Sequence, residues 1–379
     1  MQDKKFFCYE IFKNLSVWSR NGQIEYGPCS IYSGHIKKSN ELVLDETWNQ
    51  LEHQQLKQSI ENDVKLTGCK HCFNSEKNGI ESRRCGSKKL YEEFHKDTNL
   101  TIDGPQGLDY SVGNLCNLKC MICGPHNSTA WITDYQKIYP DQDISNLSYK
   151  KFEQLTISDT RFLKNLKNVH FHGGGEPLLS QSHVELLLKI KEVKGLHDVR
   201  VFYNTNATVI PSDEVLKLWE ECQLIELYFS IDDVGERFNY QRTGANWSNV
   251  TKNLNWFYNH MPHNHMFNIN CVWSYLNFFY LNELVDWYNC SFSQNRYGDP
   301  TNLIFQRAIG EFNITAMHEN IHQILQDKFV NYSQLLTLVN AVAVDNSTSH
   351  QLFWNHVNKI DNVRKQSFKQ VCPEWSQLL

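Results

Sequence analysis

The 379-residue sequence has no long uncharged apolar run. No stretch approaches the roughly 18 apolar residues that a membrane-spanning helix needs. The first residues, Met-Gln-Asp-Lys-Lys, also lack the apolar segment of a secretory signal. We therefore expect a cytoplasmic protein that makes no membrane contact.

An excess of basic residues is also missing. Lysine and arginine number 37 against 42 aspartates and glutamates, which gives a net charge of −5 with histidine neutral. This balance disfavours a nucleic-acid surface built on a large basic excess, although it leaves room for a small local groove. The apolar share of 41% and the charged share of 21% are typical of a globular chain. At about 150 residues per domain, the length predicts two or three domains.

Cysteine, in contrast, is abundant, with twelve in the chain. Disulfides do not persist in a reducing cytoplasm, so metal binding or redox chemistry is the leading explanation. Cys222, Cys271 and Cys290 stand beside apolar or aromatic neighbours, and we interpret them as small buried side chains without a role. Eight other cysteines fall in the first third of the chain, where a ligand set is therefore expected.

The tightest cysteine group is Cys116-x3-Cys120-x2-Cys123. It differs from paired C-x2-C zinc knuckles because it offers three thiolates and no obvious fourth ligand nearby. Thiolates are the usual ligands of iron–sulfur clusters, and three of them on a four-iron cube leave one iron free to bind another molecule. This spacing favours a catalytic cluster.

Strand and helix patterns alternate after residue 100. Six segments read as strands: Leu108–Gly113, Asn168–His172, Val199–Asn204, Ile225–Ile231, Met266–Tyr275 and Asn302–Ala308. Apolar residues at helical spacing lie between them, most clearly over Ser182–Val193. The alternation predicts a parallel α/β sheet, either an open partial barrel or a doubly wound sheet, with its chemistry at the carboxyl ends of the strands.

Two motifs fall at those strand ends. The three-cysteine group follows the first strand, and about 50 residues later Gly174-Gly175-Glu176-Pro177 follows the second. This order and separation resemble the radical S-adenosylmethionine (SAM) superfamily. The resemblance implies an α/β partial (βα)6 TIM-type barrel over residues 101–310, and a [4Fe-4S] cluster on Cys116, Cys120 and Cys123 whose open iron binds SAM.

The resemblance also implies contacts with SAM. Gly174 and Gly175 would let the backbone approach the ligand, Glu176 would accept a hydrogen bond from its amino group, and Pro177 would stiffen the turn. Further cofactor-binding positions carried over from the family are Ile122, Asn204, Asn206, Ser230, Asp232 and Arg242. Asp233 stands where the family has a glycine. Weaker candidates to face the substrate are Asp232, Asp233, Tyr240 and Arg307.

The first hundred residues carry a second cysteine set. A hairpin with an Asn21-Gly22 turn precedes Cys29, and Cys8, Cys29, Cys69 and Cys72 could converge on one metal. Residues 1–100 resemble the auxiliary-cluster module called twitch, a relative of the SPASM domain, which implies a second iron–sulfur cluster, most simply [4Fe-4S]. A zinc knuckle on the same four thiolates is the alternative.

Two further expectations concern Cys85 and the carboxyl-terminal residues. Cys85 is interpreted as a non-ligand, although it could replace Cys8. Residues 311–379 are expected to form a helical extension that covers the open side of the barrel.

The resemblance implies a function. A flavodoxin- or ferredoxin-type donor would reduce the first cluster, SAM would split, and the 5′-deoxyadenosyl radical would abstract hydrogen from a substrate carbon. A peptide or protein side chain is the favoured substrate, and a sugar or aminocyclitol is the alternative. Methyl transfer and sulfur insertion stay open. A non-enzymatic zinc-stapled binding protein and an RNA-modifying enzyme are the remaining alternatives, the latter disfavoured by the acidic balance.

Overall fold

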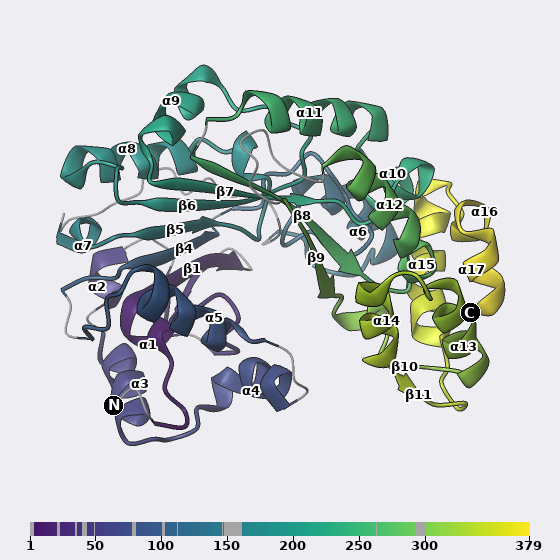
Figure 1. The fold of residues 1–379 in the computed structure, drawn as a ribbon, viewed down its shortest axis with the longest axis horizontal. Coiled ribbons are helices and arrows are strands. Elements are labelled where there is room, and N and C mark those ends of the chain that lie inside the picture. The colour runs from purple at the N-terminus through teal and green to yellow at the C-terminus, as the bar shows by residue number, and fades with distance from the viewer. Residues whose placement is uncertain are drawn as a thin grey trace. The chain divides into compact units, whose positions relative to one another are not determined.

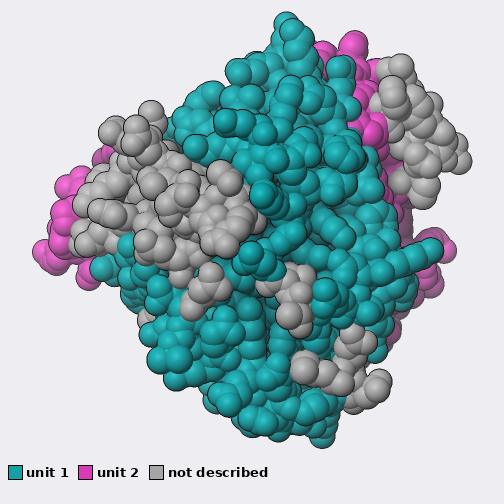
Figure 2. Space-filling view, turned by 90° about the vertical axis from the view of Figure 1, so that its left-hand side faces the viewer, with its two compact units in different colours: residues 1–115, 146–203, 211–226 teal, residues 116–145, 204–210, 227–379 magenta. Residues whose placement is uncertain are grey.

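The computed structural model describes residues 4–20, 23–34, 36–39, 44–48, 50–77, 81–100, 103–111, 113–145, 147, 161–262, 264–292 and 301–379. The chain divides into two compact units, coloured separately in Figure 2. Unit 1 holds residues 1–115, 146–203 and 211–226, and unit 2 holds residues 116–145, 204–210 and 227–379. Each unit is therefore assembled from segments that are far apart in the sequence.

Unit 1 is organised around a mixed sheet whose strands run in the order β3-β2-β1-β4-β5-β6. The pairs β1–β2 and β2–β3 are antiparallel, whereas β1–β4, β4–β5 and β5–β6 are parallel. The strands are β1 Asn14–Arg20, β2 Gln23–Gly27, β3 Lys37–Ser39, β4 Gly107–Ser111, β5 Asn168–Phe171 and β6 Arg200–Thr205, the last two residues of which belong to unit 2.

Short helices precede and follow these strands in unit 1 (Figure 1). The amino-terminal set is α1 Tyr9–Lys13, α2 Leu44–Trp48, α3 Leu51–Glu61, the 3₁₀ turn Thr67–Cys69, α4 Lys70–Lys77, α5 Arg83–Lys89 and the π-helical turn Leu90–Phe94. The later set is α7 Arg161–Lys164, the 3₁₀ turn Pro177–Leu179, α8 Ser182–Lys194 and α9 Asp213–Glu221.

The core of unit 1 holds the ends of β5 and β6 in place. Val184, Leu187 and Ile190 form the buried face of α8, as their helical spacing predicts. The ring of Tyr203 stacks on Phe171 with 4.9 Å between centroids, and its hydroxyl accepts a 3.2 Å hydrogen bond from Trp219 Nε1. Burial of each such side chain contributes about 1.5–3 kcal/mol.

Unit 2 combines parallel strands with most of the later helices. Its strand order is β7-β8-β9, and β8 His265–Trp273 pairs in parallel with β9 Asn302–Arg307. Only the last four residues of β7 Leu224–Ser230 belong to this unit. Its other elements up to residue 312 are the 3₁₀ turn Thr129–Trp131, α6 Ile132–Ile138, α10 Gly235–Gln241, α11 Trp247–His260, the 3₁₀ turn Phe278–Tyr280, α12 Leu281–Ser291 and the 3₁₀ turn Gly310–Phe312.

The carboxyl-terminal part of unit 2 is helical, as the sequence predicts. It comprises β10 Ala316–Met317, α13 Glu319–Lys328, α14 Ser333–Asn340, β11 Ala343–Val344, α15 Gln351–Arg364, α16 Phe368–Val371 and α17 Pro373–Leu378. The last turn is anchored because Trp375 is buried and its Nε1 donates to the Tyr275 carbonyl at 2.7 Å. This anchor ties the end of the chain to the loop that follows β8.

All six strands predicted after residue 100 are confirmed, with ends that differ by at most two residues. The predicted hairpin is confirmed as β1 and β2, and its Asn21-Gly22 turn lies outside the described residues. The parallel pairing of β1 with β4 was not predicted. The fold is thus α/β with mostly parallel strand pairs, and closure into a six-unit barrel remains a prediction.

Candidate functional site

The three-cysteine loop lies in unit 2 and is held by backbone hydrogen bonds to one other segment. The amide of Lys119 donates to the Thr243 carbonyl at 2.9 Å, and the amide of Met121 donates to the Gln241 carbonyl at 2.7 Å. Trp131 Nε1 donates to the Cys120 carbonyl at 2.8 Å. These bonds fix the backbone on both sides of Cys120 in a loop that has no regular secondary structure of its own.

Hydrogen-bond donors point at two of the three sulfurs. The amide of Leu118 lies 3.4 Å from Cys116 Sγ, and Asn206 Nδ2 lies 3.8 Å from the same atom. Arg242 Nη1 lies 3.8 Å from Cys120 Sγ. Donors of this kind stabilise thiolates and adjust the potential of an iron–sulfur cluster. The structure therefore brings the predicted residues Asn206 and Arg242 to the loop.

Charge around Cys120 is balanced by a buried ion pair. Arg242 Nη2 lies 2.7 Å from Asp232 Oδ2, and Asp232 Oδ1 accepts a 2.9 Å hydrogen bond from the Val272 amide. Burial raises the pKa of the Cys120 thiol to about 11, and the Arg242 guanidinium opposes that rise. Burial likewise raises the pKa of Cys123 to about 12. Since metal ligation requires thiolates, the cation beside Cys120 suits a ligand role.

The glycine turn lies in unit 1, at the end of β5. Gly174 and Gly175 have φ of +73° and +89°, values that favour glycine. A Cβ on Gly174 would lie 2.6 Å from the Gly113 carbonyl oxygen, and one on Gly175 would lie 2.7 Å from that of Leu115. The amide of Glu176 donates to the same Leu115 carbonyl at 2.7 Å. The close approach that requires these glycines is therefore to the chain's own backbone, at the residue before Cys116.

A small hollow opens at this turn, lined by Gly173–Pro177 together with Tyr110 and His172. Glu176 is 2% exposed, and its carboxylate accepts from the Leu178 amide at 3.2 Å. Pro177 begins the 3₁₀ turn that leaves the cavity. The motif thus forms a hollow whose lining includes one buried acidic residue, and recognition of an amino group by Glu176 remains a prediction.

Three other cofactor candidates have weaker support. Asn204 is exposed and Ser230 is half-buried, near the ends of β6 and β7, and neither side chain joins the hydrogen bonds seen in the described part of unit 2. Ile122 is half-buried within the cysteine loop. Their roles remain predictions.

The substrate-facing candidates make internal contacts. The carboxylate of Asp233 accepts from Arg237 Nε at 3.0 Å and from Gln241 Nε2 at 2.9 Å, and burial raises its pKa to about 7. The hydroxyl of Tyr240 donates to Asp361 Oδ1 at 2.8 Å. Arg307 Nη2 donates to the Ala341 carbonyl at 2.8 Å. These side chains hold neighbouring segments together, and a role at the substrate remains a prediction for each.

The four amino-terminal cysteines lie around one cavity in unit 1. Its lining includes two arginines, Arg83 and Arg84, together with Cys8, Cys29, Cys69 and Cys72. Cys85 is absent from this lining, and its Sγ lies 3.5 Å from Ser82 Oγ and 3.7 Å from Glu76 Oε1. The interpretation of Cys85 as a non-ligand remains a prediction.

Sulfur spacing separates two kinds of metal centre. Zinc–sulfur bonds of about 2.3 Å place tetrahedral thiolates roughly 3.8 Å apart. Among the described residues, the one group of three or more potential ligand atoms that all lie within 4.8 Å of one another is Asp109, His170 and His172, and it contains no cysteine. Neither cysteine set therefore holds three described sulfurs that all lie within 4.8 Å of one another, and the choice between zinc and an iron–sulfur cluster remains a prediction for each set.

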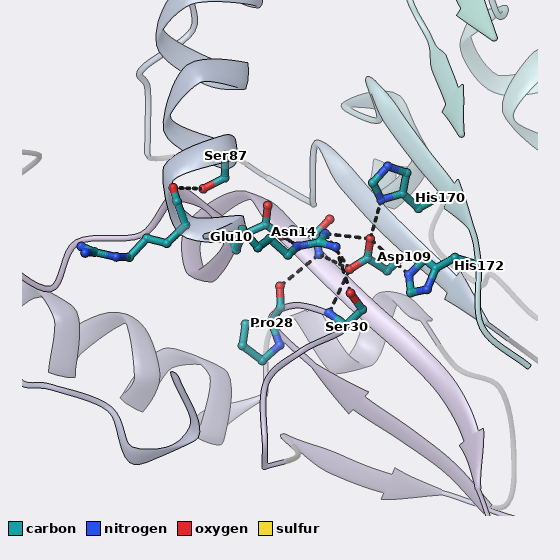
Figure 3. A network of polar contacts seen from close by, with 10 residues as sticks. Glu10, Asn14, Pro28, Ser30, Ser87, Asp109, His170 and His172 are labelled. Carbon is teal, nitrogen blue, oxygen red and sulfur yellow. Dashed lines mark hydrogen bonds and ion pairs between the residues drawn. The ribbon is translucent and has the colours of Figure 1, made fainter. Parts of the chain in front are cut away.

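The Asp109 group was missed by sequence reasoning because Asp109 lies on β4, whereas His170 lies on β5 and His172 directly after it, so the three form no local motif. Asp109 Oδ1 accepts from His170 Nδ1 at 3.0 Å and lies 3.7 Å from His172 Nε2. Figure 3 shows Asp109 between these histidines on one side and Asn14 and Glu10 on the other. Its two carboxylate oxygens also lie 2.8 Å from Arg83 Nη2, so a cation already neutralises it.

A known protein family matches the part of the chain that holds these motifs. Residues 110–272 match the model of the Radical SAM superfamily. The matched segment contains the cysteine loop, the glycine turn and Arg242. The chain therefore contains a radical SAM domain.

Among the described residues, no helix is long and apolar enough to span a membrane.

Curated relatives match over a limited length. A GTP 3′,8-cyclase of Limosilactobacillus fermentum is 26% identical over 145 residues, which are 38% of this chain and 37% of the relative. A GTP 3′,8-cyclase of Lactiplantibacillus plantarum is 26% identical over 141 residues, 37% of this chain and 38% of the relative. The chain thus spans less than two fifths of the curated relatives it matches.

Solved structures show distant similarity. Native anSMEcpe with bound AdoMet is 17% identical, with a TM-score of 0.36 over 63% of this chain and 62% of that one. SuiB of Streptococcus suis is 15% identical, with a TM-score of 0.35 over 81% of this chain and 62% of that one.

Proposed function

We propose that this chain is a radical SAM enzyme, which cleaves SAM reductively to methionine and a 5′-deoxyadenosyl radical that abstracts hydrogen from a substrate carbon. The observation that carries the proposal is the three-thiol loop of unit 2, with donors directed at Cys116 and Cys120. The radical SAM match over the same residues supports it.

The residues present fit the cofactors. Cys116, Cys120 and Cys123 would hold a [4Fe-4S] cluster, which when bound supplies the electron that splits SAM. Arg242 would offset the negative charge of the cluster, and Asn206 would stabilise the Cys116 thiolate. The buried carboxylate of Glu176 would accept hydrogen bonds from the amino group of SAM, with the glycine turn fixing its position.

A second iron–sulfur cluster would lie in the four-cysteine cavity. A cube with four thiolate ligands carries negative charge, and burying that charge requires nearby cations. Arg83 and Arg84 both line the cavity. We propose an auxiliary [4Fe-4S] cluster over a zinc knuckle on the twitch and SPASM resemblance, and these two guanidinium groups would balance its charge.

For the substrate we propose a peptide or protein side chain, on the twitch and SPASM resemblance of residues 1–100. A small molecule is the second candidate, because the curated relatives are named for a reaction of GTP. A flavodoxin- or ferredoxin-type protein would supply the electron.

Anaerobic reconstitution tests the proposal. Purified chain loaded with iron and sulfide is incubated with SAM and dithionite, and 5′-deoxyadenosine is quantified by mass spectrometry. We expect product from the parent chain and loss of it in Cys116→Ala, Cys120→Ala and Cys123→Ala. Cys290→Ala is the matched control, since this cysteine lies outside both sets. The prediction that Cys290 is buried was wrong: its side chain is exposed, unlike those of Cys222 and Cys271. No 5′-deoxyadenosine from reconstituted parent chain, with or without candidate substrates, contradicts the proposal.

A further inference from the structure

Arg83 links the four-cysteine cavity to the middle of the unit 1 sheet. Its side chain lines the cavity beside Cys29. Its Nη2 lies 2.8 Å from both carboxylate oxygens of Asp109, and its Nη1 donates to Ser30 Oγ at 2.9 Å. Glu10 Oε2 accepts from Nη2 of the same guanidinium at 2.9 Å. Arg83 is therefore held in one orientation against the cavity wall.

Asp109 is the buried negative partner in this arrangement. It lies on β4 and is 1% exposed. Its Oδ2 accepts from the Ser30 amide at 3.1 Å, one residue after Cys29, and from Asn14 Nδ2 at 3.2 Å. Asn14 in turn donates to the Pro28 carbonyl at 3.0 Å, one residue before Cys29. The carboxylate therefore braces the backbone on both sides of Cys29.

Charges on these two side chains are fixed. Burial works to raise the pKa of Asp109, but the Arg83 guanidinium and the His170 hydrogen bond hold it well below its usual range. Asp109 is thus an anion and Arg83 a cation. Arg83 lines the same cavity as Cys29, and Asp109 accepts a hydrogen bond from the amide of the residue that follows Cys29. Charges in a low-dielectric interior act strongly on one another, because water does not screen them.

We propose that Arg83 and Asp109 set the reduction potential of the auxiliary cluster in opposite directions. Reduction adds one negative charge to the cluster, so Arg83 favours it and raises the potential, whereas Asp109 opposes it and lowers the potential. Both are positioning residues in the sense that neither ligates iron. This inference rests on the proposed auxiliary cluster.

The test uses the whole 379-residue chain with Cys116, Cys120 and Cys123 replaced by alanine, so that only the auxiliary cluster titrates. Its midpoint potential is measured by a redox titration followed by electron paramagnetic resonance at one pH. The variants are Arg83→Gln, Arg83→Lys and Asp109→Asn. Lys89→Gln is the matched control, because Lys89 lies on the same helix α5 and pairs with Glu81 at 2.8 Å on the surface.

We expect Arg83→Gln to shift the potential down, Asp109→Asn to shift it up, and Arg83→Lys and Lys89→Gln to leave it near the parent value. A purely structural role would reduce iron content in both variants without opposite shifts. Equal or same-sign shifts in Arg83→Gln and Asp109→Asn overturn the inference. If Arg83→Gln does not fold, the sign of the Asp109→Asn shift decides.

The outcome also separates this inference from the function it rests on. A parent chain with no iron–sulfur signal from the four cysteines overturns the auxiliary cluster and this inference together. A normal signal whose midpoint potential is the same in the parent, Arg83→Gln and Asp109→Asn overturns this inference and leaves the auxiliary cluster in place.

Discussion

The guanidinium of Arg242 lies 3.8 Å from Cys120 Sγ. Arg242 follows helix α10, more than a hundred residues after the cysteine loop, and backbone bonds from Lys119 and Met121 to the residues on either side of it hold the two segments together. The contact places a fixed positive charge beside one of the three proposed cluster ligands.

Loss of that charge is expected to weaken the cluster. Arg242→Gln should lower the rate of 5′-deoxyadenosine formation by about tenfold or more, because a charge-assisted hydrogen bond contributes about 1.5–3 kcal/mol. The rate is measured with reconstituted protein at matched iron content. Lys252→Gln, an exposed position on α11, is the control and should match the parent. An unchanged rate in Arg242→Gln would show that Arg242 has no role at the cofactor site.

Gly175 is expected to be intolerant of any side chain. Gly175→Ala forces alanine into φ of +89° and puts Cβ 2.7 Å from a backbone oxygen. The backbone conformation alone costs roughly 1–3 kcal/mol. Gly86→Ala is the contrast, since Gly86 lies within helix α5 with open space around it, and alanine there should add about 0.5–1 kcal/mol. Urea unfolding of both variants measures the difference, and equal midpoints would contradict the observed turn.

Asp233 makes stability depend on pH. Burial raises its pKa in the folded chain to about 7, above the ordinary value of 3.8. Between these two values the folded state holds a proton that the unfolded state has released, so this group makes the chain less stable as pH rises from about 4 to about 7. The slope is at most roughly 1.4 kcal/mol per pH unit.

Asp233→Asn removes the titrating group and isolates this contribution. The parent should lose more stability than the variant between pH 5 and pH 7.5, as measured by urea midpoints. Identical pH slopes in the two proteins would show that the carboxylate of Asp233 stays ionised in the fold.

The two amino-terminal cysteine interpretations differ in iron count. Cys69→Ala or Cys72→Ala should lose about four irons per chain relative to the parent if the cavity holds a cubane cluster. Cys85→Ala should keep the parent count, because its sulfur contacts Ser82 and Glu76 instead of lining the cavity. Iron and zinc are quantified by elemental analysis. Zinc in place of iron would favour the knuckle.

Short-range signals were enough to locate both motifs, all six later strands and the main helices. Each motif lies within one short segment of the sequence, residues 116–123 for the three cysteines and residues 174–177 for the glycine turn. The periodicity that indicates a strand or a helix is also a local property. The pairing of β1 with β4 could not be predicted in this way, because parallel strands meet across a long stretch of intervening chain.

Long-range side-chain contacts were also out of reach. Arg83 contacts Asp109, and Asp109 contacts His170, only because the fold brings segments together that are distant in the sequence. The reason for the glycines differs as well: the sequence suggested room for a ligand, whereas the structure shows close approach to the carbonyls of Gly113 and Leu115. One signal was available, since Arg83 follows a serine N-cap at Ser82 and precedes Arg84, which marks a basic first turn near four cysteines.

The most direct test of the account is the effect of SAM on the reduced three-cysteine cluster. A chain with Cys69 and Cys72 replaced by alanine is reduced anaerobically, and its electron paramagnetic resonance spectrum is recorded before and after SAM is added. The account predicts a [4Fe-4S]⁺ signal that changes on addition of SAM, because one iron has no protein ligand. A spectrum that SAM leaves unchanged, or protein that carries zinc on these thiolates, would contradict it.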